Sequence, residues 1–128
     1  RFNHILQEYN NNKTYVMACI GLADLIEEEK EEKIRKYLEV NLKGYVGKVK
    51  NVVLGCTHYP LIKNEIADIL GDVKFFDGAP YVAKHLKRVL EKRKIIKQKL
   101  AKGNIEFFDT KESNEKRKRF FEILGENY

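Results

Sequence analysis

Residues 51–62 read Asn-Val-Val-Leu-Gly-Cys-Thr-His-Tyr-Pro-Leu-Ile, and this stretch indicates the fold class. Val52, Val53 and Leu54 form an apolar run without alternation, which is typical of a parallel strand covered on both faces. Pro60 suits the first turn of a helix, because the backbone N–H that proline lacks has no intrahelical partner there. The stretch therefore predicts a buried parallel strand, a short loop and a helix.

The segments on both sides continue this alternation of strands and helices. Short β-branched or apolar runs predict further strands at residues 14–18, 73–76 and 105–108. Apolar residues spaced three and four apart predict helices at residues 2–9, 22–29, 31–43 and 60–70, from Pro80 to about Leu100, and around Phe120, Phe121 and Leu124. Strands that alternate with helices indicate an α/β fold, with a parallel sheet flanked by helices.

The composition is that of a globular protein. The chain has 128 residues, 43% of them apolar, and a formal net charge of +6. No apolar run approaches the ~18 residues that a membrane-spanning helix needs, so we expect a cytoplasmic protein without membrane contact. Cys19 and Cys56 are too few for a disulfide scaffold, and both are expected to be reduced. Because Arg1 opens the chain inside an expected helix, we expect a portion of a larger protein.

Cys56 lies at the carboxyl end of the predicted central strand, immediately before a helix. In open α/β sheets, ligands gather at this edge, where the next helix offers free N–H groups and a positive dipole end. Such a site lowers the pKa of a thiol from its usual value of about 8.5, and the imidazole of His58 can exchange a proton with it. Thr57 adds a hydroxyl. Cys56 and His58 are therefore candidate catalytic residues.

Two other interpretations of these residues stay open. Cys56 can pack as a small buried hydrophobe with His58 satisfied in the core, since buried free cysteines are common. A metal site is less attractive, because His85 is distant in sequence and Cys19 stands alone. Neither alternative needs Gly, Cys, Thr, His and Pro close together at a strand-to-helix junction, so we favour the functional interpretation.

The 51–62 stretch resembles the second active-site motif of glutamate racemases, an apolar strand followed by G-C-T-H-Y-P and an apolar pair. Residues 18–27, A-C-I-G-L-A-D-L-I-E, resemble the upstream family segment, although Ile20 replaces its usual proline. Residues 73–78, V-K-F-F-D-G, resemble the downstream strand and turn. The chain is thus similar to the C-terminal portion of a glutamate racemase over nearly all its length.

The resemblance implies a cofactor-independent isomerase that interconverts L- and D-glutamate and supplies D-glutamate for peptidoglycan. Two similar α/β domains then face each other across glutamate, and each contributes one cysteine to a two-base proton transfer. By the same resemblance, Cys56 is the second catalytic cysteine, His58 tunes it, Thr57 hydrogen-bonds the substrate, and Glu27 lies near the substrate amino group. The resemblance implies no pyridoxal phosphate and no metal, and Cys19 packs the sheet.

The domain organisation also follows the resemblance. Residues 1–77 are expected to belong to the second racemase domain, and residues 78–128 to return and pack on the first domain. The motif of the first catalytic cysteine does not occur in this sequence. We therefore expect the chain to be inactive alone and to need the N-terminal domain as a partner, and we expect the complete protein to be a homodimer. Glu27 also lies in a run of three glutamates, which is commonly a solvated face.

The sequence is also compatible with two alternative functions. Between Lys84 and Lys102 there are nine Lys or Arg against the single Glu91, and residues 116–119 are all basic, a pattern that also occurs in nucleic-acid-binding fragments. Such runs more commonly mark a solvated helix face. The second alternative is an aspartate or other amino-acid racemase of the same superfamily; aspartate racemases usually carry Glu at the position of His58.

Overall fold

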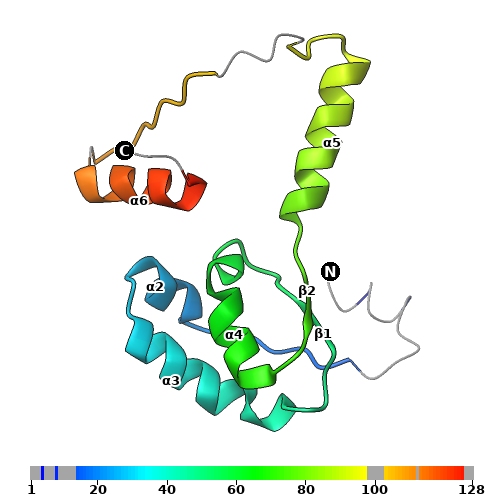
Figure 1. Ribbon diagram of the computed structural model, residues 1–128, viewed down its shortest axis with the longest axis vertical. Coiled ribbons are helices and arrows are strands. Elements are labelled where there is room, and N and C mark those ends of the chain that lie inside the picture. Colours follow the sequence, from blue (N-terminus) through cyan, green and yellow to red (C-terminus); the bar gives the residue numbers. More distant parts are fainter. Residues whose placement is uncertain (1–3, 5–7, 9–13, 98–102, 112, 126–128) are drawn as a thin grey trace. The chain divides into compact units, whose positions relative to one another are not determined.

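The computed structural model describes residues 4, 8, 14–97, 103–111 and 113–125, and it divides into two compact units, Arg1–Val89 and Leu90–Tyr128 (Figure 1). The helix expected at residues 2–9 lies largely outside the described residues. No helix in the described part of the chain is both long and apolar enough to cross a membrane.

The first unit is built on helices α2 (Leu22–Glu27), α3 (Glu31–Leu42) and α4 (Lys63–Leu70) and the 3-10 turns η1 (Lys43–Tyr45) and η2 (Tyr59–Ile62). Helix α3 packs against both α2 and α4 (Figure 1). Their apolar residues form one core together with Leu54, made of Leu22, Ile26, Ile34, Leu38, Leu42, Leu54, Ile62, Ile66 and Leu70. Burying each of these side chains contributes about 1.5–3 kcal/mol, so this core holds the segments around the Cys56 motif in place.

In the described part of the chain the sheet consists of two parallel strands, β1 (Asn51–Val53) and β2 (Lys74–Phe76). Val52 pairs with Phe75, and the Leu54 N–H donates to the Phe76 carbonyl at 2.8 Å. This arrangement confirms the parallel α/β prediction. One detail was wrong: Val53 is 64% exposed while Val52 packs against the core, because the described residues cover only one face of β1.

Two expected strands do not form in the described residues. Residues 14–18 adopt no regular structure, and Val16 is 63% exposed. Residues 105–108 are likewise irregular, with Phe108 85% exposed. A strand needs a neighbouring strand to satisfy its backbone groups, and β1 and β2 pair only with each other in the described sheet.

Helix α5 (Ala79–Lys92) begins where the sequence predicted but ends well before Leu100. The reason is a Schellman cap: the Ile95 N–H donates to the Leu90 carbonyl at 3.1 Å and the Lys94 N–H to the Glu91 carbonyl at 3.0 Å. Lys94 takes the left-handed conformation that this cap requires, with φ 55°. A lysine, rather than the usual glycine, fills that position, so the sequence did not signal the end of the helix.

Helix α6 (Asn114–Leu124) confirms the last predicted helix. Its N-terminus is capped by the Ser113 hydroxyl, which accepts from the Lys116 N–H at 3.3 Å, and it ends at Gly125 in the left-handed conformation. The Phe120 ring lies 4.9 Å from that of Phe107, which anchors the preceding segment on the helix.

Candidate active site

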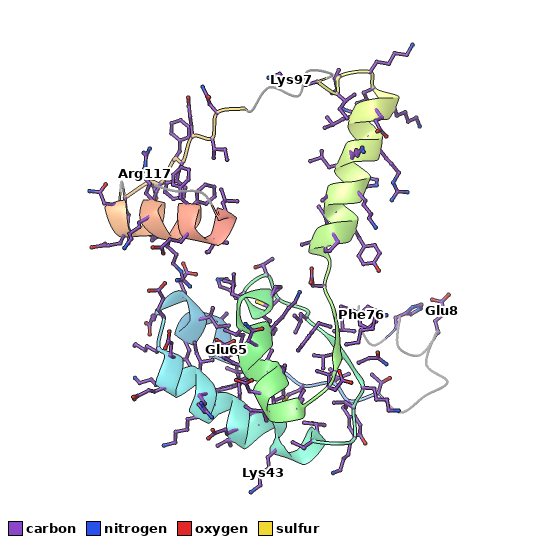
Figure 2. All side chains as sticks on the ribbon, in the orientation of Figure 1. Glu8, Lys43, Glu65, Phe76, Lys97 and Arg117 are labelled. Atoms are coloured by element: carbon purple, nitrogen blue, oxygen red, sulfur yellow. The ribbon has the colours of Figure 1, made fainter. Side chains whose placement is uncertain are left out.

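The Cys56 loop, residues 54–58, leaves the carboxyl end of β1 and enters η2. The loop is anchored on both sides, because Leu54 at its start and Ile62 in the following η2 turn are buried in the core. The loop also closes on itself: the Tyr59 N–H donates to the Cys56 carbonyl at 3.3 Å. Phe76, labelled in Figure 2, ends the neighbouring strand, so the loop leaves the sheet at the edge where ligands bind in open α/β folds.

Three side chains meet in this loop and the helix beside it. The Cys56 Sγ lies 3.7 Å from Nδ1 of His58, and Nε2 of the same imidazole lies 3.0 Å from Oε2 of Glu27. Glu27 is the last residue of α2, which packs against η2. One imidazole therefore joins a thiol on one nitrogen to a carboxylate on the other.

The electrostatics of the group favour charge separation. The pKa of the Cys56 thiol is lowered, first by the His58 backbone N–H and then by the His58 imidazole, although partial burial opposes this. The pKa of His58 is raised by its hydrogen bonds to Cys56 and to Glu27. Both shifts favour a thiolate facing an imidazolium, with both ring N–H groups donating.

The predicted site residues are brought together only in part. Cys56 and His58 lie in contact, as their spacing suggested. Thr57 lies exposed on the same loop. The Glu27 carboxylate bonds to His58, a contact that the sequence interpretation missed because 31 residues separate the two. Cys19 packs against the core, and burial raises its pKa.

Two further groups near the loop were not singled out from the sequence. The Tyr59 hydroxyl donates to the Cys19 carbonyl at 3.3 Å, although Tyr59 stands inside the recognised motif. Lys63 contacts the Asp77 carboxylate at 2.7 Å, and the second oxygen of that carboxylate accepts from the Ala79 N–H at 3.0 Å. Asp77 directly follows β2, a position that commonly carries functional or structural polar groups in parallel sheets.

Comparisons with known proteins point to one family, although no family model matches the chain. It is 38% identical over 130 residues to the glutamate racemase of Clostridium kluyveri, covering 98% of this chain and 51% of that protein. It is 32% identical over 139 residues to glutamate racemase 2 of Bacillus subtilis, with the same coverage of 98% and 51%. The chain thus spans about half the length of these curated relatives.

Solved structures agree with the sequence relatives. The glutamate racemase of Francisella tularensis, in complex with D-glutamate, matches with a TM-score of 0.63 and 27% identity, covering 77% of this chain and 38% of that one. The Thermus thermophilus enzyme, in complex with β-chloro-D-alanine, matches with a TM-score of 0.61 and 26% identity, covering 85% and 43%. With sequence and structural likeness in agreement, the chain belongs to the glutamate racemase family and corresponds to the C-terminal portion of its members.

Proposed function

We propose that this chain forms one of the two proton-transferring half-sites of a glutamate racemase. The observation that carries the proposal is the contact of the Cys56 Sγ with Nδ1 of His58 at 3.7 Å. The other ring nitrogen of His58 lies 3.0 Å from the Glu27 carboxylate. A cysteine whose pKa is lowered and which contacts an imidazole whose pKa is raised is suited to take a proton as the thiolate and to return it as the thiol.

The chemistry explains why one half-site is not enough. The α-hydrogen of an amino acid is a very weak acid, so inversion requires one group to remove it from one face while another delivers a proton to the opposite face. A single base tends to return the proton to the face from which it came. In the proposal Cys56 acts as the base toward L-glutamate and as the acid in the reverse direction. The opposing thiol comes from the half of the family fold that this chain does not span.

The other site residues receive supporting roles. His58 holds the thiolate form of Cys56, while Glu27 stabilises the imidazolium and faces the substrate amino group from its exposed side. Thr57, exposed on the loop, hydrogen-bonds the substrate. The proposal requires no pyridoxal phosphate and no metal, and stabilisation of the carbanion rests on donors held in a closed pocket.

The proposal extends to the whole protein. Residues 1–77 complete the second racemase domain, and residues 78–128 pack on the first domain, which supplies the opposing cysteine. The unpacked apolar face of α5 supports this arrangement, with Val82 68% and Leu86 56% exposed. The product D-glutamate serves peptidoglycan synthesis and cell shape in the cytoplasm, and the enzyme is a homodimer.

A chimera tests the half-site. This chain replaces the corresponding half of the C. kluyveri racemase, and racemisation is followed by circular dichroism with D- and L-glutamate and with L-aspartate. We expect glutamate turnover that Cys56→Ala abolishes without changing the far-ultraviolet spectrum, and no turnover by the chain alone. Turnover that survives Cys56→Ala, or racemisation by the isolated chain, would falsify the proposal. A preference for aspartate would support the alternative substrate of the superfamily.

A further inference from the structure

The Glu27–His58 contact is too exposed to fix its own geometry. Its side chains are 63% and 34% exposed, and solvent-exposed ion pairs contribute little net stability. Glu27 ends a helix of six residues, whereas His58 stands on a loop. The 3.0 Å distance therefore depends on how the backbone of α2 is fixed relative to the backbone of the Cys56 loop.

Tyr59 makes a second polar connection, between the residue after His58 and the segment that leads into α2. Its hydroxyl donates to the Cys19 carbonyl at 3.3 Å, and the same carbonyl accepts from the N–H of Leu22, the first residue of α2, at 3.3 Å. Tyr59 itself directly follows His58 and packs against the core. One carbonyl oxygen thus joins the start of α2 to the residue beside the imidazole.

The Tyr59 hydroxyl remains protonated, and therefore a donor, at neutral pH. Burial raises the pKa of Tyr59 to about 12, with nearby Cys19 and Cys56 adding to the effect. The phenol is therefore protonated wherever the Cys56 and His58 pair changes its charge.

We propose that Tyr59 is a positioning residue whose hydroxyl bond to the Cys19 carbonyl holds the His58 imidazole between Glu27 and Cys56. The hydroxyl touches no reacting atom, and it acts through His58. The inference rests on the proposed function for its catalytic meaning, whereas its geometry is testable on this chain alone.

The test compares Tyr59→Phe, which removes only the hydroxyl, with Tyr45→Phe, which removes another hydroxyl from the same unit. The pH profile of Cys56 alkylation by iodoacetamide is measured by peptide mass spectrometry, and the His58 ring is titrated by NMR. For Tyr59→Phe we expect the Cys56 profile to move up by about 0.5 pH unit, which slows alkylation about threefold below its midpoint. The His58 titration should move down, and Tyr45→Phe should change neither.

Glu27→Gln supplies a double-mutant cycle. If Tyr59 acts by holding the Glu27–His58 contact, Tyr59→Phe should add little in a Glu27→Gln background. Full additivity of the two shifts, or a Tyr59→Phe profile that matches Tyr45→Phe, overturns the proposal. In the unsubstituted chain the Tyr59 hydroxyl proton should exchange more slowly than that of Tyr45. Equal exchange rates would also overturn it, whether or not the variants fold.

Activity separates this inference from the proposed function. In the chimera, Tyr59→Phe should lower kcat for glutamate and leave KM nearly unchanged, because the hydroxyl donates to the Cys19 carbonyl and would act on catalysis through His58. An inactive chimera together with shifted profiles in this chain contradicts the half-site but supports the role of Tyr59. If the chimera is active but Tyr59→Phe changes neither the pH profiles nor kcat, the half-site is supported and the role of Tyr59 is contradicted.

Discussion

At the scale of single residues, the Cys56 thiolate is stabilised by two kinds of group, the backbone N–H groups of His58 and Tyr59 and the His58 imidazole. The His58 backbone N–H is the larger cause of its lowered pKa, and the imidazole is a smaller one. The N–H depends only on the course of the loop, whereas the imidazole also depends on Glu27. The two sources can therefore be separated by changing the side chain of His58 and leaving the backbone intact.

The first prediction concerns His58→Gln. The variant keeps the backbone N–H and loses the imidazole, so the midpoint of Cys56 alkylation should rise, but only part of the way to that of an ordinary thiol. Since a lowered pKa keeps the thiolate at lower pH, the loss appears as slower alkylation below the midpoint. Alkylation rates across pH measure the effect, with exposed His85→Gln on α5 as the control. An unchanged profile in His58→Gln would contradict a role for the imidazole.

The second prediction concerns the direction of catalysis in the chimera. Cys56→Ser leaves a much weaker acid and base on one face of the substrate only. The two directions should therefore slow unequally, because each thiol removes the proton from one enantiomer. Deuterium exchange at the α-carbon of D- and L-glutamate reports each abstraction step separately, and exchange should be lost more from L-glutamate. Equal slowing for both enantiomers counts against the assignment of Cys56 to one face.

At the scale of elements, the local sequence pattern predicted whether a segment is a helix or a strand better than it predicted which segments pair or pack together. The strand motif before Cys56 and residues 73–76 form β1 and β2 because each satisfies the other's backbone. Residues 14–18 and 105–108 carry similar apolar patterns but pair with no described strand. In the candidate site, Cys56 and His58 were predictable because they are two residues apart. The contact between Glu27 and His58 was not predicted from the sequence, because the packing of α2 against η2 brings the two residues together.

The third prediction concerns the junction at the end of β2. Asp77 is only 12% exposed and joins Lys63 of α4 to the first N–H of α5, and these contacts lower its pKa. A carboxylate whose folded pKa is lowered stabilises the fold fully above its unfolded pKa, and this contribution is lost as the pH falls through the folded value. Asp77→Asn should therefore reduce the free energy of unfolding at pH 7 and flatten its decline in acid. Urea unfolding between pH 2 and 7 measures both.

Asp68→Asn, on the exposed side of α4, provides the matched control for that experiment. It removes the same charge from the same unit without changing the junction. The free energy of unfolding of this variant should therefore decline in acid as that of the unsubstituted chain does. If Asp77→Asn and Asp68→Asn give the same dependence on pH, the junction does not contribute to stability.

At the scale of the whole molecule, the chain leaves apolar surface exposed. No residue of α5 is buried, although its apolar residues recur at helical spacing. Exposed apolar stripes of this kind are usually covered by another part of a protein or by a partner. The proposed covering is the first racemase domain.

The fourth prediction follows from that exposed stripe. The isolated chain should associate as its concentration rises, and Val82→Ser with Leu86→Ser should reduce this association, since both side chains are more than half exposed. Sedimentation velocity over a range of concentrations measures it. Val40→Ser on α3, at a position 73% exposed, is the matched control and should have little effect. In the chimera the same double substitution should lower the thermal midpoint, because the stripe is then buried. Equal association of the unsubstituted chain, the double variant and Val40→Ser would contradict the proposal that the apolar face of α5 drives association.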